Sequence, residues 1–175
     1  LCFLSMMESG AIFFHTGVTL YETLLSFFLT IFFSLLLSIL LWSSPMVSRI
    51  LEPYLVMLNS LPKSAMAPLL IVWLGANLKT IVVAAVSVAV FGSVMTLYTS
   101  FSQTDQELIK LIRSFGGGKR EILLKILLPA SVPVIISSMK VSLGLCLVGV
   151  IIGEFLAADS GLGYLIIYGQ QTFAM

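Results

Sequence analysis

Charged residues are scarce in this sequence. Asp, Glu, Lys and Arg make up 10% of its 175 residues, 59% are hydrophobic, and the mean hydropathy is +1.12. A soluble domain is usually about half apolar and about a quarter charged. The composition therefore excludes an ordinary soluble domain and predicts an all-α polytopic membrane protein. A net charge of +1 also argues against nucleic-acid binding as the main task.

Cysteine and histidine are nearly absent as well. Cys2 and Cys146 both lie in apolar surroundings, which favours packing roles over a disulfide or a metal site. His15 is the single histidine, and no carboxylate, cysteine or second histidine is close to it in the sequence. We therefore expect His15 to have a structural role near the membrane interface, and we predict no metal site.

Long uncharged runs predict the membrane-spanning helices. Leu24–Trp42 and Thr80–Thr104 carry no formal charge, and Pro133–Phe155 is a further apolar span that contains Lys140 and Glu154. Each of the three is long enough to cross the hydrocarbon layer. Pro53–Gly75 is also apolar but contains three prolines, so we expect a kinked helix or two half-helices there. A last apolar segment begins at Tyr164. We interpret residues 1–175 as a single transmembrane domain, a fragment with about four complete spans plus a truncated last one.

The charge that the sequence does have is concentrated in Ser102–Pro129, called the polar loop below. The chain has nine Lys and Arg and eight Asp and Glu, and eight of these seventeen residues lie in the polar loop. Five of the eight are basic, so the positive-inside rule places the loop in the cytoplasm. Thr104 to Glu107 fits a capping box, and Gly116–Gly118 ends the helix. One apolar face of this helix holds Leu108, Ile109, Leu111, Ile112 and Phe115. We predict a helix–glycine turn–helix.

A few ionisable residues interrupt the apolar segments. Lys63 and Lys140 are candidates to line a solute pathway, because charges inside a membrane are usually functional. For Lys63 the alternative is a side chain that extends from a helix break to the interface. Gln170 and Gln171 are weaker pathway candidates or interfacial polar residues. These scattered residues, with Glu154, form no catalytic set, so a membrane-embedded enzyme is disfavoured; a stand-alone channel or secondary transporter remains an alternative.

The polar loop also resembles a family signature. The transmembrane permease subunits of bacterial ATP-binding-cassette importers carry E-A-A, three residues, G, nine residues, and then I-x-L-P. The matching positions hold Gly116, Ile126, Leu128 and Pro129, whereas the E-A-A positions depart from the pattern and hold Lys110, Leu111 and Ile112. Residues 51–75 and 153–166 resemble the nitrate/sulfonate/taurine-type branch. The resemblance covers residues 16–175.

The resemblance implies a fold, a function and partners. The fold would be the type I importer transmembrane domain, and the function would be a solute pathway across the bacterial plasma membrane. The solute would be a small anion such as nitrate, a sulfonate or taurine, or a small heterocyclic precursor. Partners would be an extracytoplasmic solute-binding protein, a second permease copy in a homodimer, and the surrounding lipid bilayer.

The resemblance also gives the polar loop a task, which is to form a coupling helix that docks on separate ATPase subunits. Asp105 and Glu107 would join the seven signature positions in that contact. From the residues alone, an amphipathic loop resting on lipid head groups is the alternative. Gly116–Lys119 lacks the spacing of a phosphate-binding loop. The chain would therefore be no enzyme and bind no cofactor, since ATP and Mg²⁺ would be held by the ATPase subunits.

Overall fold

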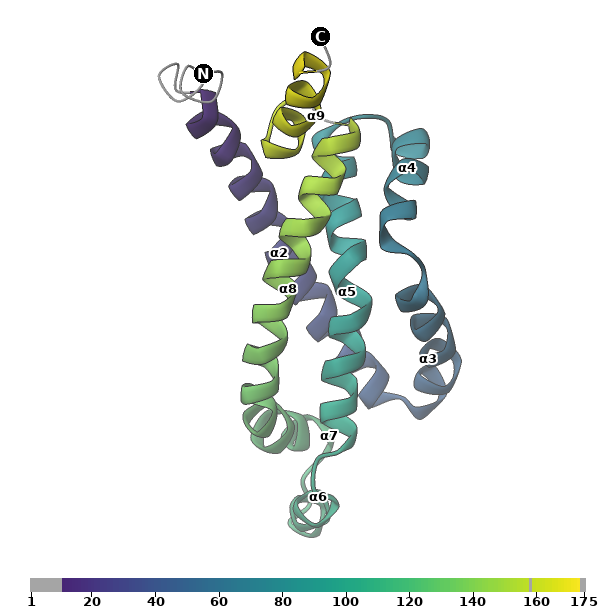
Figure 1. Ribbon diagram of the computed structural model, residues 1–175. Helices are drawn as coiled ribbons and strands as arrows, with labels where there is room; N and C mark the ends of the chain where they lie inside the picture. Colours follow the sequence, from purple (N-terminus) through teal and green to yellow (C-terminus); the bar gives the residue numbers. More distant parts are fainter. Residues whose placement is uncertain (1–10, 158, 174–175) are drawn as a thin grey trace. The chain divides into compact units, whose positions relative to one another are not determined.

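A computed structural model describes residues 11–157 and 159–173, and every regular element within this part of the chain is helical. The elements are α2 (Ala11–Ser43), α3 (Pro45–Ser60), α4 (Lys63–Leu74), α5 (Leu78–Ser102), α6 (Gln106–Ser114), α7 (Lys119–Ile122), a π-helical segment (Leu123–Leu127), α8 (Leu128–Ala157) and α9 (Leu162–Phe173) (Figure 1). The prediction of an all-α protein is confirmed.

Among the described residues, three helical stretches are long and apolar enough to cross a membrane. They are Ile12–Ser43, Leu78–Ser102 and Lys119–Ala157, and α3 with α4 makes a fourth if that pair is counted as one broken span. The expected interruption of Pro53–Gly75 is confirmed, because the chain leaves the helix at Leu61 and Pro62. The bounds differ from the expected ones: α3 already begins at Pro45, and α8 begins five residues before Pro133.

The contacts within the chain define two compact units, and α2, α5 and α8 each contribute to both. Unit 1 holds the described residues of 1–30, 61–89 and 142–175, and unit 2 holds residues 31–60 and 90–141. Each unit has its own packing. That residues 1–175 form one transmembrane domain stays a prediction.

In unit 1, α5 and α8 approach each other closely. Ile81, Ala85 and Val150 form a fully buried cluster. A Cβ atom added at Gly149 would lie 2.7 Å from the Ala85 Cα, so only glycine permits this spacing. Small residues that let helix backbones come together are a common packing device in membranes.

The buried face of α2 carries hydroxyl groups, whereas its exposed face is hydrophobic. In unit 1 the buried residues include Thr19, Ser26 and Thr30, while Leu24 and Phe28 are exposed. Helices in lipid place apolar side chains outward and polar ones against other helices. The Thr30 hydroxyl and the buried Cys146 thiol form a hydrogen bond of 3.5 Å, which agrees with a packing role for Cys146. Cys2 lies outside the described residues.

Unit 2 is built around an apolar cluster at the ends of the long helices that adjoin the polar loop. Phe101, Ile109, Ile122 and Leu127 are buried together, with Trp42 packed against them. The Ser38 hydroxyl of α2 donates to the Val94 carbonyl of α5 (3.1 Å), and the hydroxyls of Ser48 and Tyr98 join α3 to α5. This cluster is the base on which the polar loop rests.

Candidate functional site

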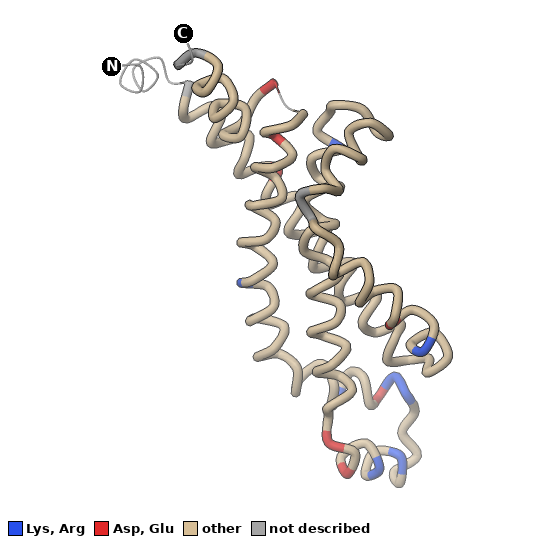
Figure 2. The backbone as a smooth tube through the Cα atoms, turned by 45° about the vertical axis from the view of Figure 1, so that its right-hand side comes forward, with Lys and Arg blue, Asp and Glu red and all other residues tan. Residues whose placement is uncertain are grey.

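The polar loop connects α5 to α8 entirely within unit 2. Figure 2 shows acidic and basic positions gathered along this connection, while the long helices are almost free of them. The helix–glycine turn–helix prediction is confirmed, with α6 before the turn and α7 after it. The loop is therefore an ordered element with a defined surface.

The start of α6 is fixed by an aspartate. The Asp105 carboxylate accepts the Glu107 backbone N–H at 2.8 Å, and α6 begins at Gln106. The prediction of Thr104 as the N-cap is wrong, because the Thr104 hydroxyl instead donates to the Ser100 carbonyl at the end of α5. Threonine and aspartate both cap helix starts well. Thr104 is still bonded to the last turn of α5, so the next residue, Asp105, caps α6.

The end of α6 is a Schellman turn that requires glycine at two positions. The N–H of Gly117 donates to the Ile112 carbonyl (2.9 Å), and that of Gly116 donates to the Arg113 carbonyl (3.0 Å). Gly116 has a φ of +80°, in the left-handed region, which agrees with the predicted glycine cap. A Cβ at Gly117 would lie 2.3 Å from the Ile112 Cγ2, so the close approach excludes any side chain there.

The apolar residues of α6 share the one face that the sequence predicts, and only one edge of that face is buried. Ile109 is 6% exposed in the apolar cluster of unit 2, and Ile112 packs against that cluster. Leu108, Leu111 and Phe115 are instead 45%, 53% and 84% exposed, and we call these three residues the outer stripe. Ile109 and Ile112, at one edge of the predicted apolar face, anchor the helix, and the outer stripe stays exposed.

The return path from the turn enters the membrane helix without a break. The Gly118 N–H donates to the Glu121 carboxylate (2.7 Å), and α7 continues through the π-helical segment into α8. Within that segment the N–H of Leu128 reaches back to the Leu123 carbonyl. Because proline lacks an N–H and displaces the preceding turn, this wider register lets Pro129 lie inside a continuous helix.

A lysine ties the loop to α2. The Lys119 ammonium donates to the Ser43 carbonyl at 3.1 Å, at the end of α2. A cation at a helix C-terminus is favoured because the last carbonyls carry partial negative charge. The loop is therefore attached to α2 through this contact as well as to α5 and α8 through the chain.

The structure places every residue that we predicted for ATPase coupling on or beside this loop, and their coupling role stays a prediction. Asp105 caps α6, Glu107 follows the cap, and Lys110 and Leu111 are exposed on α6. Ile112 faces the cluster and Gly116 forms the turn. The remaining three, Ile126, Leu128 and Pro129, lie in the π-helical segment and the first turn of α8.

The predicted pathway residues are not gathered at one place. Lys140 is exposed on α8 within unit 2, far from either end of the Lys119–Ala157 span. Gln170 and Gln171 are exposed on α9 within unit 1. Lys63 is the first residue of α4, and its side chain lies outside the described residues. Their pathway role stays a prediction.

Sequence reasoning missed a hydrogen-bonded junction at the start of α9. Three successive backbone N–H groups each meet a side chain of α2 or α8. Gly161 donates to the His15 Nδ1 (2.9 Å), Leu162 to the Thr19 hydroxyl (2.9 Å), and Gly163 to the Glu154 Oε2 (2.8 Å). These acceptors satisfy the unpaired N–H groups at the helix start. They agree with the structural role expected for His15.

Two buried carboxyl groups lie side by side behind this junction. Glu154 is 1% exposed and accepts the Thr19 hydroxyl at its Oε1 (2.7 Å). Glu22 is 3% exposed, and its carboxyl lies beside that of Glu154. The sequence does contain a signal for a buried polar face on α2. Polar residues recur there at the spacing of one helix face, namely His15, Thr19, Glu22 and Ser26.

Known proteins resemble this chain over most of its length. Residues 30–175 match the family described as the binding-protein-dependent transport system inner membrane component. The formylaminopyrimidine transport permease protein ThiX of Halalkalibacterium halodurans is 28% identical, over 90% of this chain and 63% of that protein. The putative aliphatic sulfonates transport permease protein SsuC of Bacillus subtilis is 28% identical, over 98% of this chain and 62% of that protein.

The chain therefore spans less than two thirds of the length of these two relatives. Among solved structures, an inward-facing form of the MetNI methionine ABC transporter matches with a TM-score of 0.71. That match covers 86% of this chain and 78% of the other, at 21% sequence identity. The likeness shows that the fold is the transmembrane domain of a type I importer.

Proposed function

The chain belongs to the family of binding-protein-dependent transport system inner membrane components, in its sulfonate/taurine-like branch, and from this premise we propose that it is the permease subunit of an ATP-binding-cassette importer. It is an integral membrane protein. On this proposal the polar loop lies in the cytoplasm and docks on separate ATPase subunits, which hold and hydrolyse ATP. The chain itself is then a transport subunit without a cofactor of its own.

The observation that carries this proposal is the outer stripe of α6. Three large apolar side chains stand exposed on a helix whose other residues are mostly charged or polar. A contiguous apolar stripe with a polar rim is typical of a protein-binding surface. An apolar groove on the ATPase subunit would bury these side chains, in the manner of an amphipathic helix bound in a groove.

The substitutions at the E-A-A positions fit this docking mode. Leu111 supplies the centre of the outer stripe, Ile112 anchors α6 to the cluster beneath, and Lys110 stands exposed beside them. Because α6 is held by caps at both ends and by the buried Ile109, a push on its outer face moves the ends of α5 and α8 as one body.

The rest of the importer follows from the same proposal. A second copy of the chain would complete the solute pathway, with Lys140, Gln170, Gln171 and Lys63 as candidates to line it. An extracytoplasmic binding protein would deliver the solute. The relatives named for aliphatic sulfonates and for formylaminopyrimidine support a small anion, such as nitrate, taurine or another sulfonate, or a small heterocycle as that solute.

The test is a charge placed in the outer stripe. We expect Leu111→Glu to reduce co-purification of the ATPase subunit with the permease at least tenfold, because docking would bury a carboxylate. Gln106→Glu is the matched control: it adds the same charge to α6 at an exposed helix N-terminus, where a carboxylate is favoured. Co-purification is measured by pull-down from membranes that contain both subunits.

Two outcomes separate the possibilities. Loss of the ATPase subunit with Leu111→Glu but not with Gln106→Glu supports docking through the outer stripe. Undiminished co-purification with Leu111→Glu would contradict it and would favour a loop that rests on lipid.

A further inference from the structure

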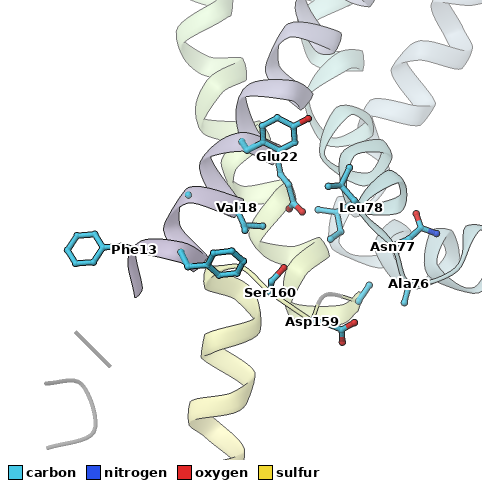
Figure 3. Close-up of a pocket in the computed structure, with 13 residues that line it drawn as sticks. Phe13, Val18, Glu22, Ala76, Asn77, Leu78, Asp159 and Ser160 are labelled. Carbon is cyan, nitrogen blue, oxygen red and sulfur yellow. The ribbon is translucent and has the colours of Figure 1, made fainter. Parts of the chain in front are cut away.

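A cavity of about 630 Å³ lies in unit 1 between the start of α2, the turn before α5 and the turn after α8 (Figure 3). Its size falls within the range of small-molecule sites in proteins. Because α5 and α8 each cross the membrane once, these two turns lie on the opposite side from the polar loop. With the polar loop in the cytoplasm, the cavity is extracytoplasmic.

Glu22 presents an unpartnered acceptor to this cavity. Figure 3 shows its carboxyl directed into the space between Val18 and Leu78. The side chain is 3% exposed, and its Oε2 has no hydrogen-bond partner. Burying a carboxyl oxygen without a hydrogen-bond donor costs more free energy than an ordinary hydrogen bond contributes. Such a group therefore usually marks a missing partner.

The carboxyl group next to Glu22 is already engaged elsewhere. Both oxygens of Glu154 already accept hydrogen bonds, one from the Thr19 hydroxyl and one from the Gly163 N–H. Another carboxylate beside Glu22 adds repulsion, which a donor or positive charge would relieve. None of the described residues that line the cavity is Lys or Arg. A donor group on a bound molecule would relieve this repulsion, which no cation of the described lining offsets.

The walls restrict what that donor can belong to. Phe13, Phe14 and Tyr21 line the cavity with aromatic side chains that are mostly exposed, and Asp159 adds a second acidic group. Aromatic side chains favour flat ring systems, which stack or meet them edge to face. The two carboxylates in the lining, Glu22 and Asp159, disfavour a sulfonate, a phosphate or another anion.

We propose that this cavity binds a small aromatic nitrogen compound that carries an N–H donor and no anionic group, with Glu22 accepting that N–H. The inference rests on the importer proposal for the side of the membrane and for the role of the site, which is to receive solute before it enters the pathway. It narrows the proposed substrates from anions or heterocycles to heterocycles.

The experiment compares 4-aminopyrimidine with pyrimidine, which has the same ring without the donor, and with benzenesulfonate, a flat anion. Binding to the complete importer, purified with its ATPase subunit and placed in phosphatidylglycerol vesicles, is measured by calorimetry. These lipids carry no amine that could compete for Glu22. We expect 4-aminopyrimidine to bind at least tenfold more tightly than either other compound.

Two variants locate the site. Glu22→Gln removes the carboxylate at nearly constant shape, and Gly17→Leu fills the cavity, since a Cβ at Gly17 meets no atom within 4 Å. Both should weaken 4-aminopyrimidine binding at least tenfold. Gly144→Leu is the matched control, because Gly144 also has open space around it and does not line the cavity. It should bind as the unchanged protein does.

The proposal is overturned if 4-aminopyrimidine fails to bind, if benzenesulfonate binds as well, or if Gly17→Leu leaves its affinity unchanged. Co-purification of the ATPase subunit is recorded on the same samples. If the ATPase subunit co-purifies and both cavity variants still bind 4-aminopyrimidine with unaltered affinity, only the proposed site is refuted. If the ATPase subunit does not co-purify with the unchanged protein, the importer proposal is refuted.

Discussion

Gly117→Ala should uncouple the polar loop from the membrane helices. The added Cβ would lie 2.3 Å from the Ile112 Cγ2 and 2.9 Å from the Ile112 carbonyl oxygen, where carbon atoms normally stay about 3.5–4 Å apart. Ile112 has little room to turn away, because it packs against the cluster that contains Ile109 and Phe101. The Schellman turn at the end of α6 must therefore open.

These contacts set the free-energy cost of Gly117→Ala to the turn. Overpacking of this kind typically costs about 1–3 kcal/mol, and loss of the hydrogen bond from Gly117 to the Ile112 carbonyl costs a further ~1 kcal/mol. A change of about 2–4 kcal/mol shifts the ratio of closed to open turn by roughly 30- to 1,000-fold. Gly118→Ala is the matched control, because Gly118 has an extended backbone and no atom within 4 Å of an added Cβ.

Two measurements test this prediction. Trypsin should cleave Gly117→Ala faster than the unchanged chain after Arg113 or Lys119, which border the turn. ATP hydrolysis stimulated by the binding protein should fall in the reconstituted importer. Gly118→Ala should behave as the unchanged chain in both assays. Equal cleavage and equal ATP hydrolysis in the two alanine variants would refute the close packing of Gly117 against Ile112.

Two further predictions concern the membrane helices. Gly149→Ala should lower the midpoint of thermal unfolding in detergent by an amount equivalent to about 1–3 kcal/mol, because its Cβ would lie 2.7 Å from the Ala85 Cα. Gly144→Ala, with open space, should raise stability slightly, and a shift of the same sign in both would rule out the tight contact. Lys140→Ala should reduce uptake of the solute about tenfold, as loss of a ~1.4 kcal/mol interaction would do, whereas Lys140→Arg should retain most of it. Normal uptake by Lys140→Ala would remove Lys140 from the pathway.

Some features of the polar loop could be read directly from the residue pattern, and others could not. Gly116 is conspicuous after an amphipathic stretch, since a left-handed cap needs glycine, and the structure confirms it. Which of two capping residues begins α6 depends on where α5 ends, so the choice between Thr104 and Asp105 was not decided locally. The division of the apolar residues into an anchored set and an outer stripe depends on what α6 packs against, namely Phe101 and Trp42.

The pairing of the two buried carboxyl groups could be predicted from the sequence even less well. Glu22 and Glu154 are 132 positions apart, and each looks like an isolated charge near the end of an apolar run. Helical spacing predicts that Glu22 shares a face with His15 and Thr19, but it does not predict which helix that face meets. The meeting of α2, α8 and the start of α9 puts the two carboxyls together and leaves one oxygen of Glu22 without a donor.

The sequence by itself determined the class of protein, the positions of the long helices and the helix–glycine turn–helix of the polar loop, because these depend on hydrophobic runs, caps and glycines that act over a few residues. Only the tertiary structure decided which surfaces remain open. These are the outer stripe of α6 on the polar loop and the cavity that Glu22 lines. Both depend on contacts between segments distant in the chain, and a buried charge or an exposed apolar stripe has meaning only once its neighbours are known.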